Sequence, residues 1–108
     1  MKYSYPSEKF SVARHSLMLP HPKGEAESIM HAFHECSLGL HDVDRDSLDD
    51  DARKWVHELE ELMNTGGLED PTSKGLWVIK AEQLTIDNKF RLSHIVDELA
   101  CWFDRADS

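Results

Sequence analysis

Apolar residues recur at intervals of three and four along most of the chain, which is the spacing of one face of an α-helix. The pattern is clearest from residue 48 onward, at Leu48, Ala52, Trp55, Val56, Leu59, Leu62 and Met63. The alternation of every second residue that is typical of a half-buried strand occurs over no useful length, and no segment is repeated. The sequence therefore predicts an all-α fold, a compact bundle of four to five helices with short loops.

Capping and breaking residues set the expected ends of these helices. The expected helices cover residues 7–19, 25–40, 47–63, 70–84 and 87–103. The third has the clearest start, because Ser47 and Asp50 resemble a capping box, and Gly66 and Gly67 follow its end. The fourth is expected to begin at Asp70, with Pro71 at its first helical position.

The length of 108 residues predicts one helical domain over residues 1–108, with residues 1–6 as a loose N-terminal arm. Cys36 and Cys101 lie far apart in sequence, and we expect two buried thiols rather than a disulfide. No apolar run approaches the roughly 20 residues that span a bilayer, so no membrane partner is expected. The N-terminal residues lack the apolar stretch of a signal peptide, and the expected localisation is cytoplasmic.

Charge is concentrated in the middle of a chain whose net charge is −9. Residues 24–66 hold twelve acidic side chains against three basic ones. Such a balance disfavours direct binding of nucleic acid, which needs a basic face, and it suits a protein partner of basic character. The aspartates that the sequence assigns to partner binding are Asp42, Asp44, Asp46, Asp49, Asp50 and Asp51. The plainer alternative is an acidic helix start that favours the helix dipole and solubility.

The same aspartates also suggest a calcium loop as a third hypothesis. Asp42, Asp44 and Asp46 take the spacing of the first three ligands of a helix–loop–helix calcium site, which collects oxygen atoms around a turning loop. However, Ser47 stands where the loop needs glycine, and Arg53 stands where it needs a bidentate glutamate. These departures weigh against calcium.

A row of histidines in the second expected helix suggests a metal site as the alternative function. On a helical wheel, one side of this segment carries Glu27, His31, His34 and His41. Spacings of three and four residues can hold zinc, or iron or manganese with added carboxylates. The His-Glu-x-x-His pattern of zinc hydrolases is absent, and the other alternative is a polar face whose histidines titrate near neutral pH.

Catalytic motifs are missing from the sequence, and no catalytic residue or cofactor is predicted apart from the alternative of a divalent metal. Cys36 belongs to the apolar side of its helix, where an inert thiol is expected. The last helix is apolar on more than one side, which favours a homodimer through Phe90, Trp102 and Phe103. We therefore expect a non-enzymatic adaptor or regulator that works through protein–protein contacts.

Overall fold

The computed structural model describes residues 2–107, and these residues form helices and connecting loops without a strand. The elements are α1 (Ser4–Ser16), α2 (Glu25–Leu40), the 3-10 helix η1 (Arg45–Ser47), α3 (Asp50–Met63), α4 (Leu76–Gln83) and α5 (Ile86–Asp107). The prediction of an all-α bundle of four to five helices is confirmed. None of the helices in the described part of the chain is both long and apolar enough to cross a membrane.

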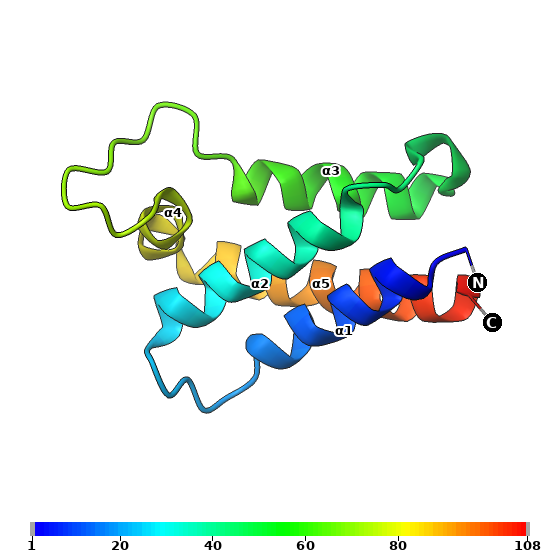
Figure 1. Cartoon of the computed structure of the whole chain (residues 1–108), viewed down its shortest axis with the longest axis horizontal. Helices are drawn as coiled ribbons and strands as arrows, with labels where there is room; N and C mark the ends of the chain where they lie inside the picture. The colour runs from blue at the N-terminus through cyan, green and yellow to red at the C-terminus, as the bar shows by residue number, and fades with distance from the viewer. Residues whose placement is uncertain (1, 108) are drawn as a thin grey trace.

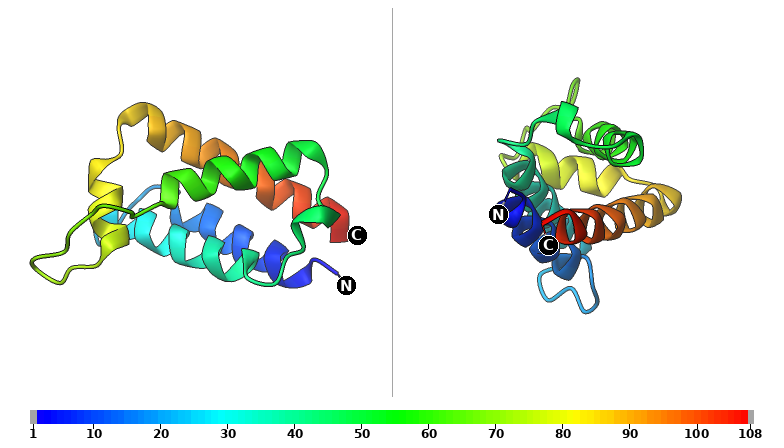
Figure 2. Two further views of the ribbon diagram at one scale, coloured as in Figure 1. Left: turned by 90° about the horizontal axis from the view of Figure 1, so that it is seen from above. Right: turned by 90° about the vertical axis from the view of Figure 1, so that its right-hand side faces the viewer.

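Four of the helices run roughly along the longest dimension of the molecule, which measures 42 × 30 × 23 Å (Figure 1). α1 and α2 form an antiparallel hairpin, α5 lies along α1, and α3 packs against α5. α4 lies across this direction and packs against α2 (Figure 2). The chain termini lie at one end of the bundle, which we call the terminal end, and α4 lies at the other, which we call the distal end.

One cluster of buried apolar side chains is shared by all five α-helices. Its largest fully buried members include Phe10, Phe33, Phe103, Leu59, Leu92, Ile95 and Leu99. In α2, the four residues predicted to share an apolar side, Ile29, Phe33, Cys36 and Leu40, are all buried. Helical spacing therefore identified the packed side of α2 correctly.

Gly39, near the end of α2, allows α1 to lie close to α2. A Cβ atom at this position would lie 3.0 Å from the Cβ of Lys9 and 3.3 Å from the ring of Phe10. The sequence suggests only that this glycine weakens the end of the helix. In the structure, it is the missing side chain that permits the contact between the two helices.

The predicted loose arm over residues 1–6 is wrong for the residues that the structure describes, while residue 1 lies outside them. Tyr3 is buried, and its backbone N–H donates a hydrogen bond of 2.9 Å to Asp107 Oδ1. α1 begins at Ser4 and ends at Ser16, three residues before its predicted end. The segment is ordered because the ring of Tyr3 packs against Trp102 and Phe103. The sequence of the segment itself does not reveal these contacts, because both partners lie at the other end of the chain.

Two predicted helix starts are displaced. α3 begins after Asp49 rather than Ser47, because Asp49 accepts the N–H of Ala52 at 2.9 Å. α4 begins at Leu76 rather than at Asp70 and Pro71, so the loop from residue 64 to residue 75 is longer than predicted. The carboxylate of Asp70 accepts the backbone N–H groups of residues 74 and 75, both at 2.9 Å, and fixes a turn there instead of a helix.

Candidate functional site

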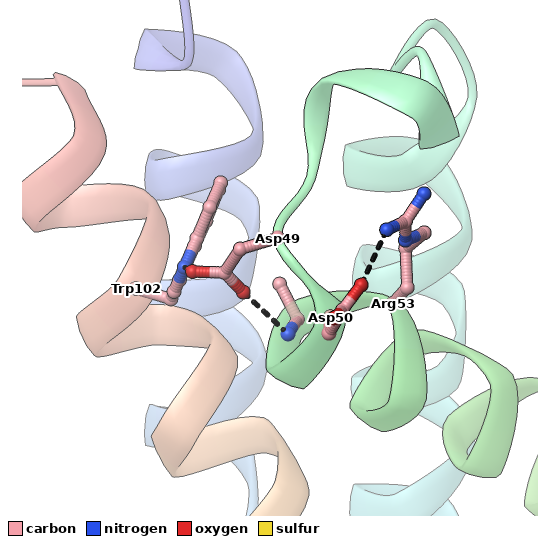
Figure 3. A network of polar contacts seen from close by, with 5 residues as sticks. Asp49, Asp50, Arg53 and Trp102 are labelled. Atoms are coloured by element: carbon pink, nitrogen blue, oxygen red, sulfur yellow. Dashed lines mark hydrogen bonds and ion pairs between the residues drawn. The ribbon is translucent and has the colours of Figure 1, made fainter.

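The aspartates from residue 42 to residue 51 are all exposed, and they lie on the connection between α2 and α3 and on the first turn of α3. Two of them stabilise this connection through their side chains. Asp44 Oδ1 accepts the N–H of Asp46 at 3.0 Å and thereby caps η1. Asp49 caps α3, and its second oxygen accepts the indole N–H of Trp102 at 2.9 Å (Figure 3). Asp44 and Asp49 therefore have structural roles that account for their presence without a partner.

Asp49 joins two segments of the terminal end. Its carboxylate links the start of α3 to Trp102 of α5. A separate hydrogen bond of 2.8 Å joins the hydroxyl groups of Tyr3 and Ser47. The N–H of Ala52 and the indole N–H both stabilise the ionised carboxylate, so they hold the pKa of Asp49 below its usual range, although its desolvation opposes this. The neighbouring arginines, Arg105 and Arg53, lower this pKa further.

The other four aspartates are also exposed, and none of them is the N-cap residue of η1 or α3. Asp50 forms an ion pair of 2.6 Å with Arg53 within the first turn of α3. Oδ1 of Asp42 lies 3.9 Å from Nε2 of His41. The carboxylates of Asp46 and Asp51 have no hydrogen-bond or ion-pair partner among residues 2–107. We call Asp42, Asp46, Asp50 and Asp51 the acidic face.

Two arginines close to the acidic face in sequence form ion pairs within the molecule. Arg45 forms a bidentate pair with Glu60, at 3.1 and 3.2 Å. The arginine at residue 53 is paired with Asp50. Exposed pairs of this kind contribute little to stability, but they leave fewer cations to neutralise the aspartates nearby.

The histidines that were predicted to line one side of α2 do not come together. His31, His34 and His41 are all exposed. His31 lies 3.9 Å from Glu27, while the ring of His34 faces the edge of Trp77 with 6.4 Å between the ring centres. Within residues 2–107, no three His, Cys, Asp or Glu side chains are placed to hold a metal ion. The described structure therefore assembles neither the predicted metal site nor the calcium loop.

The three residues predicted for self-association differ in their exposure to solvent. Phe103 is fully buried and packs against Phe10, so its assignment to a surface contact is wrong. Trp102 is half-buried, and its indole N–H donates the hydrogen bond to Asp49 described above. Phe90 remains 72% exposed and is available for an intermolecular contact.

The two cysteines are both free, as predicted, but they differ in environment. Cys36 is buried on α2, where desolvation, followed by the nearby charge of Glu35, raises the pKa of its thiol. This thiol stays protonated and is unreactive at neutral pH. Cys101 is exposed on α5, so the prediction that it is buried is wrong.

Sequence reasoning missed two hollows on either side of the loop that precedes α4. The polar hollow, of about 520 Å³, includes Leu40, His41, Arg45, Glu60, Met63 and Trp77. The apolar hollow, of about 430 Å³, includes Met30, Lys74, Gly75, Leu76, Trp77 and Val78. Trp77 lines both hollows, and its indole N–H donates to the carbonyl of Met63 at 3.2 Å. Trp77 is half-buried and packs against the apolar core.

Comparisons with models of known protein families, with characterised proteins and with solved structures find no match to this chain.

Proposed function

We propose that this protein is a non-enzymatic adaptor or regulator that binds a basic protein through its acidic face. The observation that supports this proposal is the presence of carboxylates that the fold does not use. Asp44 and Asp49 cap helices, whereas the carboxylates of Asp46 and Asp51 have no partner among the described residues. Among residues 2–107, the basic group within ion-pair distance of the Asp42 carboxylate is that of His41, at 3.9 Å.

The plainer account, an acidic start that favours the dipole of α3, covers only part of the acidic face. Asp50 and Asp51 lie in the first turn of α3, where negative charge is stabilising. Asp42 lies eight residues before the helix, and the effect of the dipole is confined to the terminal turn. Like charges repel one another, so exposed carboxylates are more favourable beside a cationic surface than beside other carboxylates alone.

The chemistry of the partner follows from the charge. Exposed carboxylates attract lysine and arginine side chains and accelerate association at low ionic strength. The arginines at residues 45 and 53 are paired with Glu60 and Asp50, whereas the carboxylates of Asp46 and Asp51 have no partner among the described residues and can be neutralised by the cations of a partner. A polyanion such as nucleic acid is repelled by the same face.

The test is capture of partners from a cell lysate by the immobilised chain, followed by identification of what is bound. Changing Asp42, Asp46 and Asp51 together to asparagine is expected to abolish capture of basic proteins while the circular dichroism spectrum stays helical. Capture by the unaltered chain is expected to weaken steeply as salt is raised, since exposed charges are screened over about 8 Å at physiological ionic strength.

A matched control changes the net charge by the same amount elsewhere. Glu8, Glu69 and Glu98 lie on α1, on the loop before α4 and on α5, and the triple change to glutamine is expected to leave capture intact. If the control variant and the aspartate variant lose capture equally, only net charge matters and the proposed face is wrong. Capture that is unchanged in the aspartate variant also refutes it.

A further inference from the structure

Another hollow lies at the terminal end of the bundle, between the first residues of the chain and the connection from α2 to α3. Its volume is about 230 Å³. The lining includes two aromatic residues, Tyr3 and Tyr5, two acidic residues, Asp42 and Asp44, and one basic residue, Lys2. We call it the tyrosine hollow. Aromatic rings and carboxylates together form a surface that suits a cationic side chain.

Ammonium groups of the chain itself lie over both tyrosine rings of this hollow. Nζ of Lys2 lies 5.3 Å from the ring centre of Tyr3, and Nζ of Lys9 lies 5.4 Å from the ring centre of Tyr5. Both distances are within the roughly 6 Å over which the negative face of an aromatic ring attracts a cation. These contacts are independent of the aspartates, and they indicate that the two rings bind ammonium groups.

The two lysines differ in how firmly they are held. Lys9 is half-buried and forms an ion pair of 3.5 Å with Glu35 of α2. Lys2 is exposed, lies before the start of α1 and has no ion-pair partner within residues 2–107. The ammonium group of Lys2 is therefore the one that another cation can replace over the ring of Tyr3.

The carboxylates of the tyrosine hollow are not paired with a lysine or an arginine in the described part of the chain. Oδ1 of Asp42 lies 3.9 Å from Nε2 of His41, which is a cation only when it is protonated. Oδ1 of Asp44 accepts the backbone N–H of Asp46. With two aspartates and one lysine in its lining, the hollow keeps a negative charge that attracts a further cation.

We propose that the tyrosine hollow binds a lysine or arginine side chain of the basic partner, and that Lys2 occupies the same place until the partner displaces it. The hollow shares Asp42 with the acidic face, so its role rests on the proposed function and adds the place where one cation of the partner is recognised. Lys2 then acts as an internal competitor, which lowers the apparent affinity for the partner. An acidic side chain is repelled by the two carboxylates.

Titration of the full chain with the blocked tripeptide Ala-Lys-Ala, followed by NMR, tests the hollow without the unidentified partner. The expected dissociation constant is on the order of 1–10 mM, because a single side chain makes few contacts. The largest shifts are expected at Tyr3, Tyr5 and Gly39, which all line the hollow. Matched peptides with norleucine or glutamate in place of lysine lack the positive charge, and neither is expected to bind.

Three variants separate this site from general attraction to an acidic protein. Lys2→Gln removes the competing ammonium group and is expected to tighten binding of the lysine peptide about 2–5-fold. Lys23→Gln changes the net charge equally in the loop between α1 and α2, away from the terminal end, and is expected to leave binding unchanged. Tyr5→Leu replaces a ring that is 49% exposed, and it is expected to weaken binding about 2–5-fold without loss of helicity.

Three results overturn the proposed cation site: equal binding of the lysine and norleucine peptides, shifts spread evenly over the acidic face, or equal affinities of the Lys2→Gln and Lys23→Gln variants. If one of these occurs while the asparagine variant of the acidic face still loses capture of basic proteins, the hollow is wrong and the proposed function stands. If the lysine peptide binds as expected but the unaltered chain captures no basic protein, the proposed function is wrong and the hollow remains a cation site.

Discussion

At the terminal end of the bundle, side chains from separate segments hold one another in place, whereas at the distal end apolar side chains remain exposed. Tyr3 contacts Ser47, Trp102 and Asp107, and Trp102 contacts Asp49. At the distal end, Ile86 and Phe90 project into solvent. The comparison teaches that helices of similar periodicity can have their apolar side chains covered within the chain at one end of a bundle and left exposed at the other.

The largest expected difference between the ends is in their aromatic side chains. Phe103→Ala is expected to lower the free energy of unfolding by about 3–5 kcal/mol, because it leaves a cavity beside Tyr3 and Phe10. Phe90→Ala, at low protein concentration, is expected to change it by less than about 0.5 kcal/mol. Urea denaturation measures both, and similar losses would show that the two ends are equally packed.

A smaller difference is expected between the caps of α3 and α5. Asp49→Ala removes a helix cap and also the acceptor for Trp102, and a loss of about 2 kcal/mol in unfolding free energy is expected. Thr85 Oγ1 accepts only the N–H of Asn88, at 3.1 Å, so Thr85→Ala is expected to cost about 1 kcal/mol. Thermal or urea unfolding that ranks Thr85 above Asp49 contradicts the proposed linkage between α3 and α5.

Substitution of Gly39 and of Gly66 compares the packing at two positions of the chain. Gly39→Ala introduces a Cβ atom only 3.0 Å from Lys9 Cβ, and this crowding is partly offset by the higher helix propensity of alanine. Gly39→Ala is expected to lower the free energy of unfolding by about 1 kcal/mol. Gly66→Ala, in the loop before α4, meets only the flexible end of Asn64 and is expected to stay within about 0.5 kcal/mol in the same urea measurement. A neutral Gly39→Ala would show that α1 can move away from α2.

The smallest expected effect is a dependence of stability on pH. Because the pKa of Asp49 is lowered in the folded state, its contribution is fully present above the unfolded value of about 3.9 and is lost as pH falls through the lower folded value. Asp49→Asn removes this titration. Its unfolding free energy is therefore expected to approach that of the unaltered chain as the solution is acidified below about pH 4, and a constant difference would contradict this assignment.

Parts of the site followed from the sequence, and parts did not. The composition of the sequence identified the acidic segment. It did not show which of the six aspartates cap helices. Asp49 is one of six aspartates in ten residues, and its role depends on Trp102, which lies 53 positions later in the chain. Of the predicted histidine row, His31 and His34 lie in α2 and His41 follows its last residue. Within residues 2–107, no other ligand side chains are placed beside them to complete a metal site.

The sequence by itself determined that the chain is helical and which side of α2 is packed, because these properties arise from a local period of 3.6 residues. The tertiary structure decided that residues 3–6 are ordered, that Gly39 is a contact point and that Phe103 is internal while Phe90 is not. Both phenylalanines belong to the same helix, and helical spacing alone shows where they point relative to α5. What lies opposite each of them depends on how distant segments pack, since a side chain is buried only when another segment covers it.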